Sequence, residues 1–142
     1  MLSRRLLLAA PVVGLTGCIE TLPPVDFPLL PDADLIDAVV SGGFTREYGS
    51  YTLRNRIEDP DRCRFITAFL NARRKGFTTP FAGPPIPACA LHLRREGKLL
   101  SLVGIGTYFL QRAMFETLSI PKAEIMELLA LAGLDETALE HR

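Results

Sequence analysis

The residues with the widest chemical scope in this 142-residue chain are three cysteines and two histidines. Cys63 lies one turn into a predicted helix, a position that lowers a thiol pKa, and His92 is the residue available as its base. No motif joins the two, and His92 alternates onto the strand face opposite to Cys89. His141 is the penultimate residue of the chain. We therefore expect no catalytic residue and no enzyme activity.

The same residues are weak candidates for a metal site. Cys63, Cys89 and His92 would have to converge, and their spacing matches no ligand pattern, so we expect no metal and no cofactor. Both cysteines are predicted to face the core, and conditions beyond a membrane are usually oxidising, so a Cys63–Cys89 disulfide is expected. It would close a loop of about 27 residues and stabilise the fold by roughly 3–4 kcal/mol. The alternative is two unpaired buried thiols.

Acidic residues and glycines at suggestive spacings have structural explanations. The acids of residues 58–61 coincide with a predicted helix start, where capping accounts for them without acid–base catalysis. The acids of residues 32–37 are interpreted in the same way. Gly104 and Gly106 lack the third glycine and the following helix of a phosphate-binding loop, and they indicate a bend or bulge in a strand.

The third cysteine stands at the end of an export signal. Residues 1–17, MLSRRLLLAAPVVGLTG, have two arginines followed by an apolar core of about ten residues, which is too short to span a bilayer as a helix. The sequence LTGC at residues 15–18 resembles the lipobox of bacterial lipoproteins. The resemblance implies cleavage before Cys18, acylation of its thiol with palmitate or a similar chain, and stable attachment to the lipid bilayer. The alternative is an ordinary signal peptide with an incidental cysteine.

The lipobox resemblance implies a location in the cell envelope. In enterobacterial lipoproteins an aspartate after the cysteine favours retention in the inner membrane, and this chain has Ile19. We therefore expect the outer membrane, facing the periplasm, rather than the inner membrane. Residues 3–8, SRRLLL, are similar to a twin-arginine export motif, and the alternative is that the arginines are the usual basic charge of a signal peptide.

Proline content divides the remaining chain in two. Residues 18–31 contain the expected lipidated cysteine and four prolines, which exclude a helix and favour a semi-rigid tether. In the alternative, Phe27, Leu29 and Leu30 in the second half of this segment pack onto the domain. Residues 32–142 have the pattern of a single α+β domain.

The elements of that domain follow from the spacing of apolar residues. The pattern predicts a helix at roughly 33–41, a strand near 51–57, and a helix that begins at Asp59 and Pro60. A hairpin is predicted over residues 88–106 with its turn at Glu96-Gly97. Residues 107–118 fit a strand or a helix, and a further helix with a short last turn follows. The predicted fold is a small antiparallel sheet packed with three to four helices.

Two features are candidates for an interaction surface. The proline-rich loop of residues 76–88 is expected to expose Phe77, Phe81 and Ile86 unless the domain covers them. Residues 54–98, which include Arg94 and Arg95, contain ten Lys and Arg against four Asp and Glu, although the whole chain has a formal net charge of zero. This basic region could meet anionic lipid headgroups or an acidic partner. The alternative is a solvated face paired with the acidic carboxyl-terminal segment.

These observations favour a non-enzymatic envelope lipoprotein that binds or scaffolds another, unidentified envelope component. A second hypothesis is a binder or inhibitor of a soluble protein or ligand that acts through the loop of residues 76–88. A third is an enzyme of a kind that the sequence does not reveal. Nucleic acid is not an expected partner in this compartment.

Overall fold

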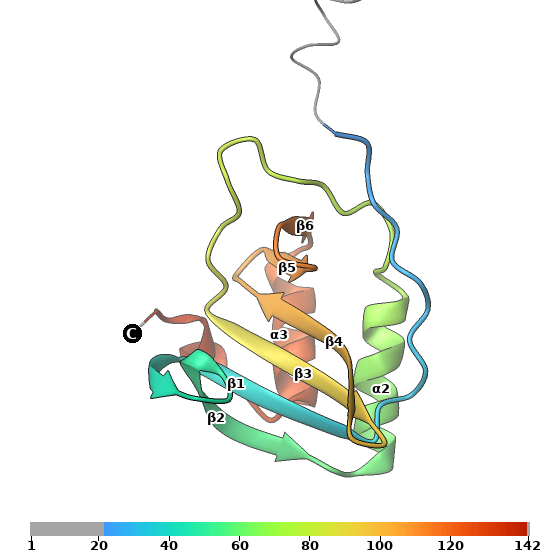
Figure 1. Ribbon diagram of the computed structural model, residues 1–142, viewed down its shortest axis with the longest axis vertical. Coiled ribbons are helices and arrows are strands. Elements are labelled where there is room, and N and C mark those ends of the chain that lie inside the picture. Colours follow the sequence, from blue (N-terminus) through green and yellow to red (C-terminus); the bar gives the residue numbers. More distant parts are fainter. Residues whose placement is uncertain (1–21, 142) are drawn as a thin grey trace, which may run out of the picture.

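The computed structural model describes residues 22–141, which form one antiparallel sheet with two helices against one of its faces (Figure 1). The strand order is β2-β1-β3-β4-β5-β6, so β1 lies between β2 and β3. The elements are β1 (Leu35–Thr45), β2 (Gly49–Ile57), α2 (Pro60–Asn71), β3 (Cys89–Arg95), β4 (Lys98–Ile105), β5 (Phe109–Arg112), β6 (Glu116–Ser119), α3 (Lys122–Leu131) and the 3₁₀ turn η1 (Glu136–Leu139).

The predicted fold class, α+β with a small sheet and three to four helices, is wrong. The described residues form six strands and two α-helices, and the single further helical segment is the four-residue η1. Two segments account for the difference. Residues 33–41 were predicted as a helix, and residues 107–118 were left open between helix and strand, but both segments form strands. The sheet is therefore the larger part of the structure.

The first of these segments is residues 33–41, where a helix was predicted and β1 is found. Its apolar residues satisfy a period of two as well as a helical period. Ile36, Ala38 and Val40 belong to the core under the helices, while Asp37 and Val39 are buried outside that core cluster. A run of residues buried on both faces, with β-branched side chains, is typical of a central strand.

The second is residues 107–118, which form the short strands β5 and β6. Ala113 and Met114 in the connection both have positive φ angles, 52° and 64°, so the chain reverses there and cannot continue as a helix. Residues 109–112 pair in register with residues 116–119. This hairpin extends the sheet beyond β4.

Other predictions are confirmed. The hairpin of residues 88–106 is β3 and β4 with Glu96 and Gly97 at the turn, and the strand near 51–57 is β2. Helix α2 begins as predicted, with the Asp59 carboxylate accepting a hydrogen bond from the Arg62 amide at 3.0 Å and Pro60 in the first turn. It ends at Asn71.

The proline-rich segment before β1 runs along the edge of the domain, and we call residues 25–30 the strap. Val25 pairs with Phe77 through two backbone hydrogen bonds, and the Leu30 amide and carbonyl both bond the Asn71 side chain. Phe27 and Leu30 pack against the core, as the alternative interpretation of this segment held, whereas Leu29 remains exposed.

Candidate functional site

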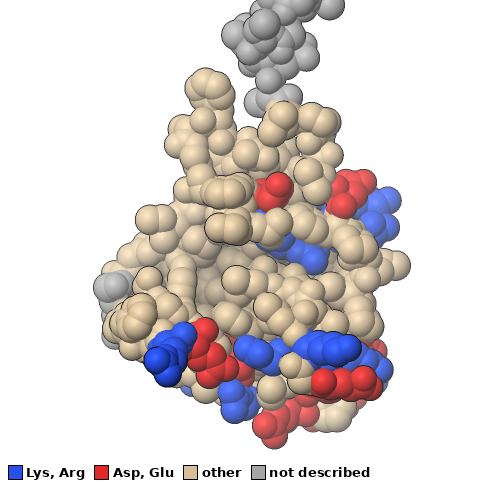
Figure 2. All heavy atoms as spheres, in the orientation of Figure 1, with Lys and Arg blue, Asp and Glu red and all other residues tan. Residues whose placement is uncertain are grey.

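The face of the sheet opposite the helices carries a groove with a volume of about 760 Å³. Figure 2 shows the hollow at the centre of this face, surrounded mainly by uncharged side chains. Ala90 of β3 and Leu102 and Gly104 of β4 line it, and the strap and the β1–β2 turn contribute to its two ends. The volume falls within the range of about 300–1,000 Å³ that is typical of small-molecule sites.

Strand alternation explains why the groove is largely apolar. In β3, Cys89, Leu91 and Leu93 enter the core, so Ala90 and His92 are left for the open face. Gly104 is required in β4, because a Cβ at this position would lie 2.5 Å from the Pro87 Cγ atom. The glycine predicted to mark a bend therefore makes room for Pro87 at the wall of the groove.

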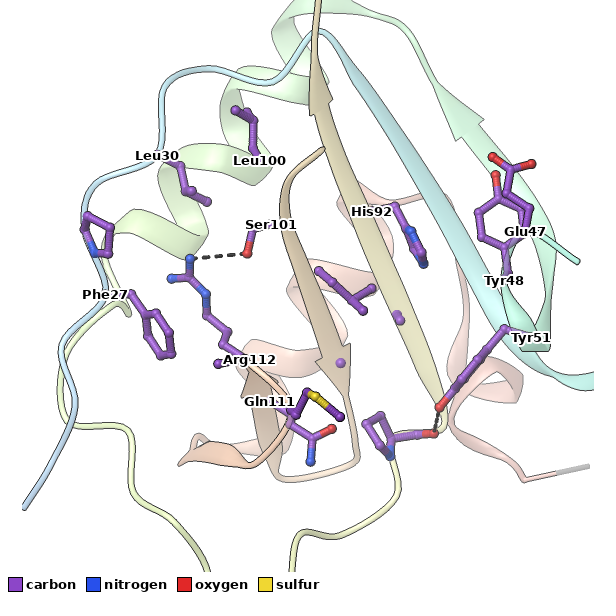
Figure 3. A pocket seen from close by; sticks show the side chains of 17 residues that line it. Phe27, Leu30, Glu47, Tyr48, Tyr51, His92, Leu100, Ser101, Gln111 and Arg112 are labelled. Carbon is purple, nitrogen blue, oxygen red and sulfur yellow. Dashed lines mark hydrogen bonds between the residues drawn. The ribbon is translucent and has the colours of Figure 1, made fainter. Parts of the chain in front are cut away.

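One end of the groove holds Arg112, which is only 5% exposed. Its Nη2 atom donates to the Ser101 hydroxyl at 3.3 Å, and its guanidinium lies over the Phe27 ring of the strap, 4.3 Å from the centroid (Figure 3). The Nε and Nη1 atoms are buried and have no hydrogen-bond partner among the described residues. Burial lowers the pKa of Arg112 below its ordinary value.

The opposite end of the groove is organised by Asp37, whose side chain is 1% exposed. The Tyr48 hydroxyl donates to Asp37 Oδ2 at 2.7 Å, and Arg56 Nε donates to Oδ1 at 2.7 Å. Burial by itself raises the pKa of Asp37, but the hydrogen bonds from Arg56 and Tyr48 and the nearby positive charges of Arg56 and Arg94 lower it by more, so the net shift is downward. The Asp37 carboxylate is therefore ionised and fully engaged.

His92 lies between the two ends and lines the groove beside Tyr48, with ring centroids 5.0 Å apart (Figure 3). Burial and the Arg94 charge lower the pKa of His92, although Asp37 and Glu47 act in the opposite direction. The lowered pKa favours the neutral imidazole at neutral pH. No described thiol or hydroxyl is hydrogen-bonded to its ring. Cys63, the thiol considered from the sequence as the partner of His92, is fully buried in the core on the helix side of the sheet, so that pairing has no geometric basis.

The two cysteines of the expected disulfide are both free and buried in the structure. Cys63 Sγ points to the Ile57 carbonyl at 3.5 Å, and Cys89 Sγ to the Ile105 carbonyl at 4.0 Å, so each thiol has its own backbone acceptor. Burial raises the pKa of Cys63 and raises that of Cys89 to about 12.

These thiols should be chemically inert until the protein unfolds. A pKa near 12 leaves Cys89 roughly 1,000-fold less thiolate than an ordinary cysteine. Iodoacetamide at pH 7.5 should leave both cysteines unlabelled in the native protein and label both after unfolding in guanidinium without reductant. Peptide mass spectrometry provides the measurement, and two unlabelled cysteines in the unfolded, unreduced chain would instead reveal a disulfide.

The residues predicted for an interaction surface are not brought together. Phe77 is fully buried, because the strap covers it and the Phe27 ring packs edge-on at 4.9 Å, so its expected exposure is wrong. Phe81 and Ile86 are exposed, at 96% and 75%. The loop therefore does not present the three apolar residues as one surface.

The predicted basic residues, Arg94 and Arg95, lie at the end of β3 that is farther from the loop of residues 76–88. Arg94 approaches Asp37 at 3.9 Å and Glu47 at 3.7 Å, and Arg95 donates to the Asp32 carbonyl at 2.7 Å. Both arginines are thus engaged with acidic or carbonyl groups of the same chain. Cys18, the expected lipidation site, lies outside the described residues.

Within residues 22–141, no group of three or more His, Cys, Asp or Glu side chains is placed to hold a metal ion. No described helix has the length and apolar character needed to cross a bilayer.

Sequence reasoning missed Arg112 and Tyr48 as site residues. A signal for Arg112 was present, because it is the only charged residue between Lys98 and Glu116, in a stretch rich in apolar residues. A charged residue in such a stretch is usually exposed, and if it is buried it normally has a partner that compensates its charge. Tyr48 had no comparable signal, since only the β1–β2 turn directs its hydroxyl to Asp37.

Comparison with known proteins yields no relative: no protein-family model, curated protein or solved structure matches this chain. The fold and the groove therefore define the class of protein, a small antiparallel-sheet domain with one grooved, open face.

Proposed function

We propose that this protein is a lipid-anchored, non-enzymatic binding module that holds an apolar small molecule in the groove on the open face of its sheet. The observation that carries the proposal is the groove itself, about 760 Å³ in volume, lined mostly by apolar residues and crossed by strands β3 and β4. Sites of this size with few polar groups are typical of ligand binding.

The polar groups around the groove favour binding over catalysis. Asp37 is occupied by Tyr48 and Arg56, and His92 has no nucleophile bonded to it among the described residues. General acid–base catalysis requires a titratable group with a free proton path to a reacting atom. Asp37 behind the groove is fully engaged, and Glu47, the carboxylate that lines the groove, lies 3.7 Å from Arg94, so these groups are better suited to orient a ligand.

The proposed anchor is supported by the pattern LTGC at residues 15–18 and by the position of Leu22, which is close to this pattern in the sequence. Leu22 is four residues beyond Cys18, a span of at most about 14 Å in extended chain. The described chain enters at the end of the molecule that carries the loop of residues 76–88 (Figure 1), and this loop has no charged residue. An uncharged end with exposed Phe81 and Ile86 is compatible with close approach to a bilayer.

A neutral fluorescent probe tests the binding function. N-phenyl-1-naphthylamine should bind the wild-type protein saturably with one-to-one stoichiometry, because its apolar rings fit the groove. Leu102→Glu should weaken this binding at least tenfold by placing a carboxylate on the groove floor, and Leu102 is 48% exposed, so the fold tolerates the change. Fluorescence titration measures both affinities.

Phe65→Glu supplies the matched control. Phe65 is 52% exposed and lies on α2, the helix layer on the opposite face of the sheet, so its substitution should leave probe binding unchanged. Equal loss in both variants, or no saturable binding to the wild type, would contradict the proposed function.

A further inference from the structure

We infer that the ligand of the groove is a single-chain amphiphile with one carboxylate, and that the Arg112 guanidinium binds this carboxylate. The inference rests on the proposed function and names the chemical class of its ligand. It starts from the one charged group of the groove that has no partner of opposite charge.

Arg112 is buried and underused as a donor. A guanidinium has five N–H groups, and here the structure gives it one hydrogen bond, from Nη2 to the Ser101 hydroxyl at 3.3 Å, together with the Phe27 ring at 4.3 Å. Nε and Nη1 have no partner among the described residues. Leaving buried charged donors without hydrogen bonds costs free energy. An anion that bonds to these donors removes this cost, so its binding is favoured.

No carboxylate of the described chain fills this role. Glu116 is the cross-strand neighbour of Arg112 in the β5–β6 pair, yet the two side chains form no ion pair. The carboxylates at the far end of the groove, Asp37 and Glu47, are associated with Arg56 and Arg94. An external anion is therefore the complement that Arg112 lacks.

Charge matching favours a carboxylate with an apolar body. One buried positive charge is neutralised by one negative charge, and the planar fork of a guanidinium matches the two oxygens of a carboxylate. The same groove is lined by Leu102, Ala90 and Gly104, which offer contact surface to an alkyl chain. At the opposite end Arg56 and Arg94 are already associated with Asp37 and Glu47, so that end offers no unpaired cation to a second anionic group.

Binding requires a small rearrangement of Arg112. Its Nε and Nη1 atoms are covered, while the guanidinium adjoins the groove that it lines. The strap is fixed by backbone bonds at Val25 and Leu30, so the long arginine side chain is the part that turns toward the ligand. The 3.3 Å contact to Ser101 is weak and does not oppose this rotation.

Decanoate and decanol test the inference in the wild-type chain, because they share an alkyl length and differ in charge. Isothermal titration calorimetry at pH 7.5 should show decanoate binding at least tenfold tighter than decanol. Equal affinities would overturn the inference and leave the proposed function standing. Absence of binding by both, together with failure of the neutral fluorescent probe, would remove the proposed function and this inference with it.

Arg112→Met separates recognition from a structural role. The variant should bind decanoate only as tightly as decanol, keep the wild-type affinity for decanol, and unfold at a higher temperature, since an unpaired buried charge has been removed. Arg54→Met, which replaces an exposed arginine outside the groove, should change neither affinity. A lower unfolding temperature with unchanged preference for decanoate would identify Arg112 as structural and overturn the inference.

Discussion

Replacement of Cys18 by serine should move the protein from the membrane fraction to the soluble fraction. The proposed anchor is the acylated thiol, and acyl chains contribute ~0.8 kcal/mol for each buried methylene. Two or three chains therefore hold the protein on the membrane, and a variant without acyl chains loses this attachment. A hydroxyl cannot accept the thioether-linked diacylglyceryl group. The expected change is from nearly complete to background membrane recovery, measured by fractionation and by incorporation of labelled palmitate.

Cys63→Ser and Cys89→Ser are the matched controls, since both residues lie in the described core and neither can reach a bilayer in the folded protein. Each should retain palmitate incorporation, whatever its effect on stability. If the Cys18→Ser variant keeps its label and its membrane recovery, the lipobox interpretation is incorrect. A wild-type chain recovered uncleaved and without lipid would lead to the same conclusion.

Replacement of Asp37 by alanine should cost about 3 kcal/mol of unfolding free energy, because hydrogen bonds to a charged group contribute roughly 1.5–3 kcal/mol each. Asp37 is buried and accepts from Tyr48 and Arg56, so alanine leaves the Tyr48 hydroxyl without its acceptor and opens space between β1 and its neighbours. This is a large part of the 5–15 kcal/mol that stabilises an ordinary domain. Urea unfolding at pH 7 measures the loss.

The same network determines the response to acid. The pKa of Asp37 is lower in the folded protein than in the unfolded chain, so its contribution is complete above the unfolded value near 4 and is lost as pH falls through the folded value. The stability difference between wild type and Asp37→Ala should therefore shrink below pH 4. A difference that stays constant down to pH 2 would contradict this account.

An exposed ion pair provides the comparison for Asp37. Lys122 and Glu136 meet at 2.5 Å with both side chains largely exposed, so Glu136→Gln should leave the unfolding free energy at pH 7 unchanged. Equal effects of the two substitutions would show that burial gives Asp37 no special weight.

The comparison of sequence with structure shows where local pattern is informative. The hairpin of residues 88–106 and helix α2 were predictable because their signals are local: alternation around Glu96-Gly97, and a capping aspartate followed by proline. The segment of residues 33–41 was not, because Leu35, Ile36, Val39 and Val40 fit a helical face as well as a strand buried on both sides. Only pairing with β2 and β3 decides between them.

Residues of the candidate site show the same limit. His92 was placed correctly on the strand face opposite to Cys89, and this is why it lines the groove. Asp37 was interpreted as part of a helix start, and its burial beside Tyr48 and Arg56 could not be inferred while β1 was taken for a helix. Arg112 drew no attention, although an arginine in an apolar stretch is unusual.

The sequence by itself determined the features that depend on neighbouring residues: the cap of α2, the β3–β4 hairpin and the inward direction of Cys63. The export signal ending in Cys18 stays a prediction. The tertiary structure decided which face of the sheet the helices cover and which face stays open. It also decided that Phe77 is covered by the strap and that Arg112 is buried without a carboxylate partner. These outcomes depend on contacts between segments far apart in the chain, and such contacts leave no periodic trace in the sequence of either segment.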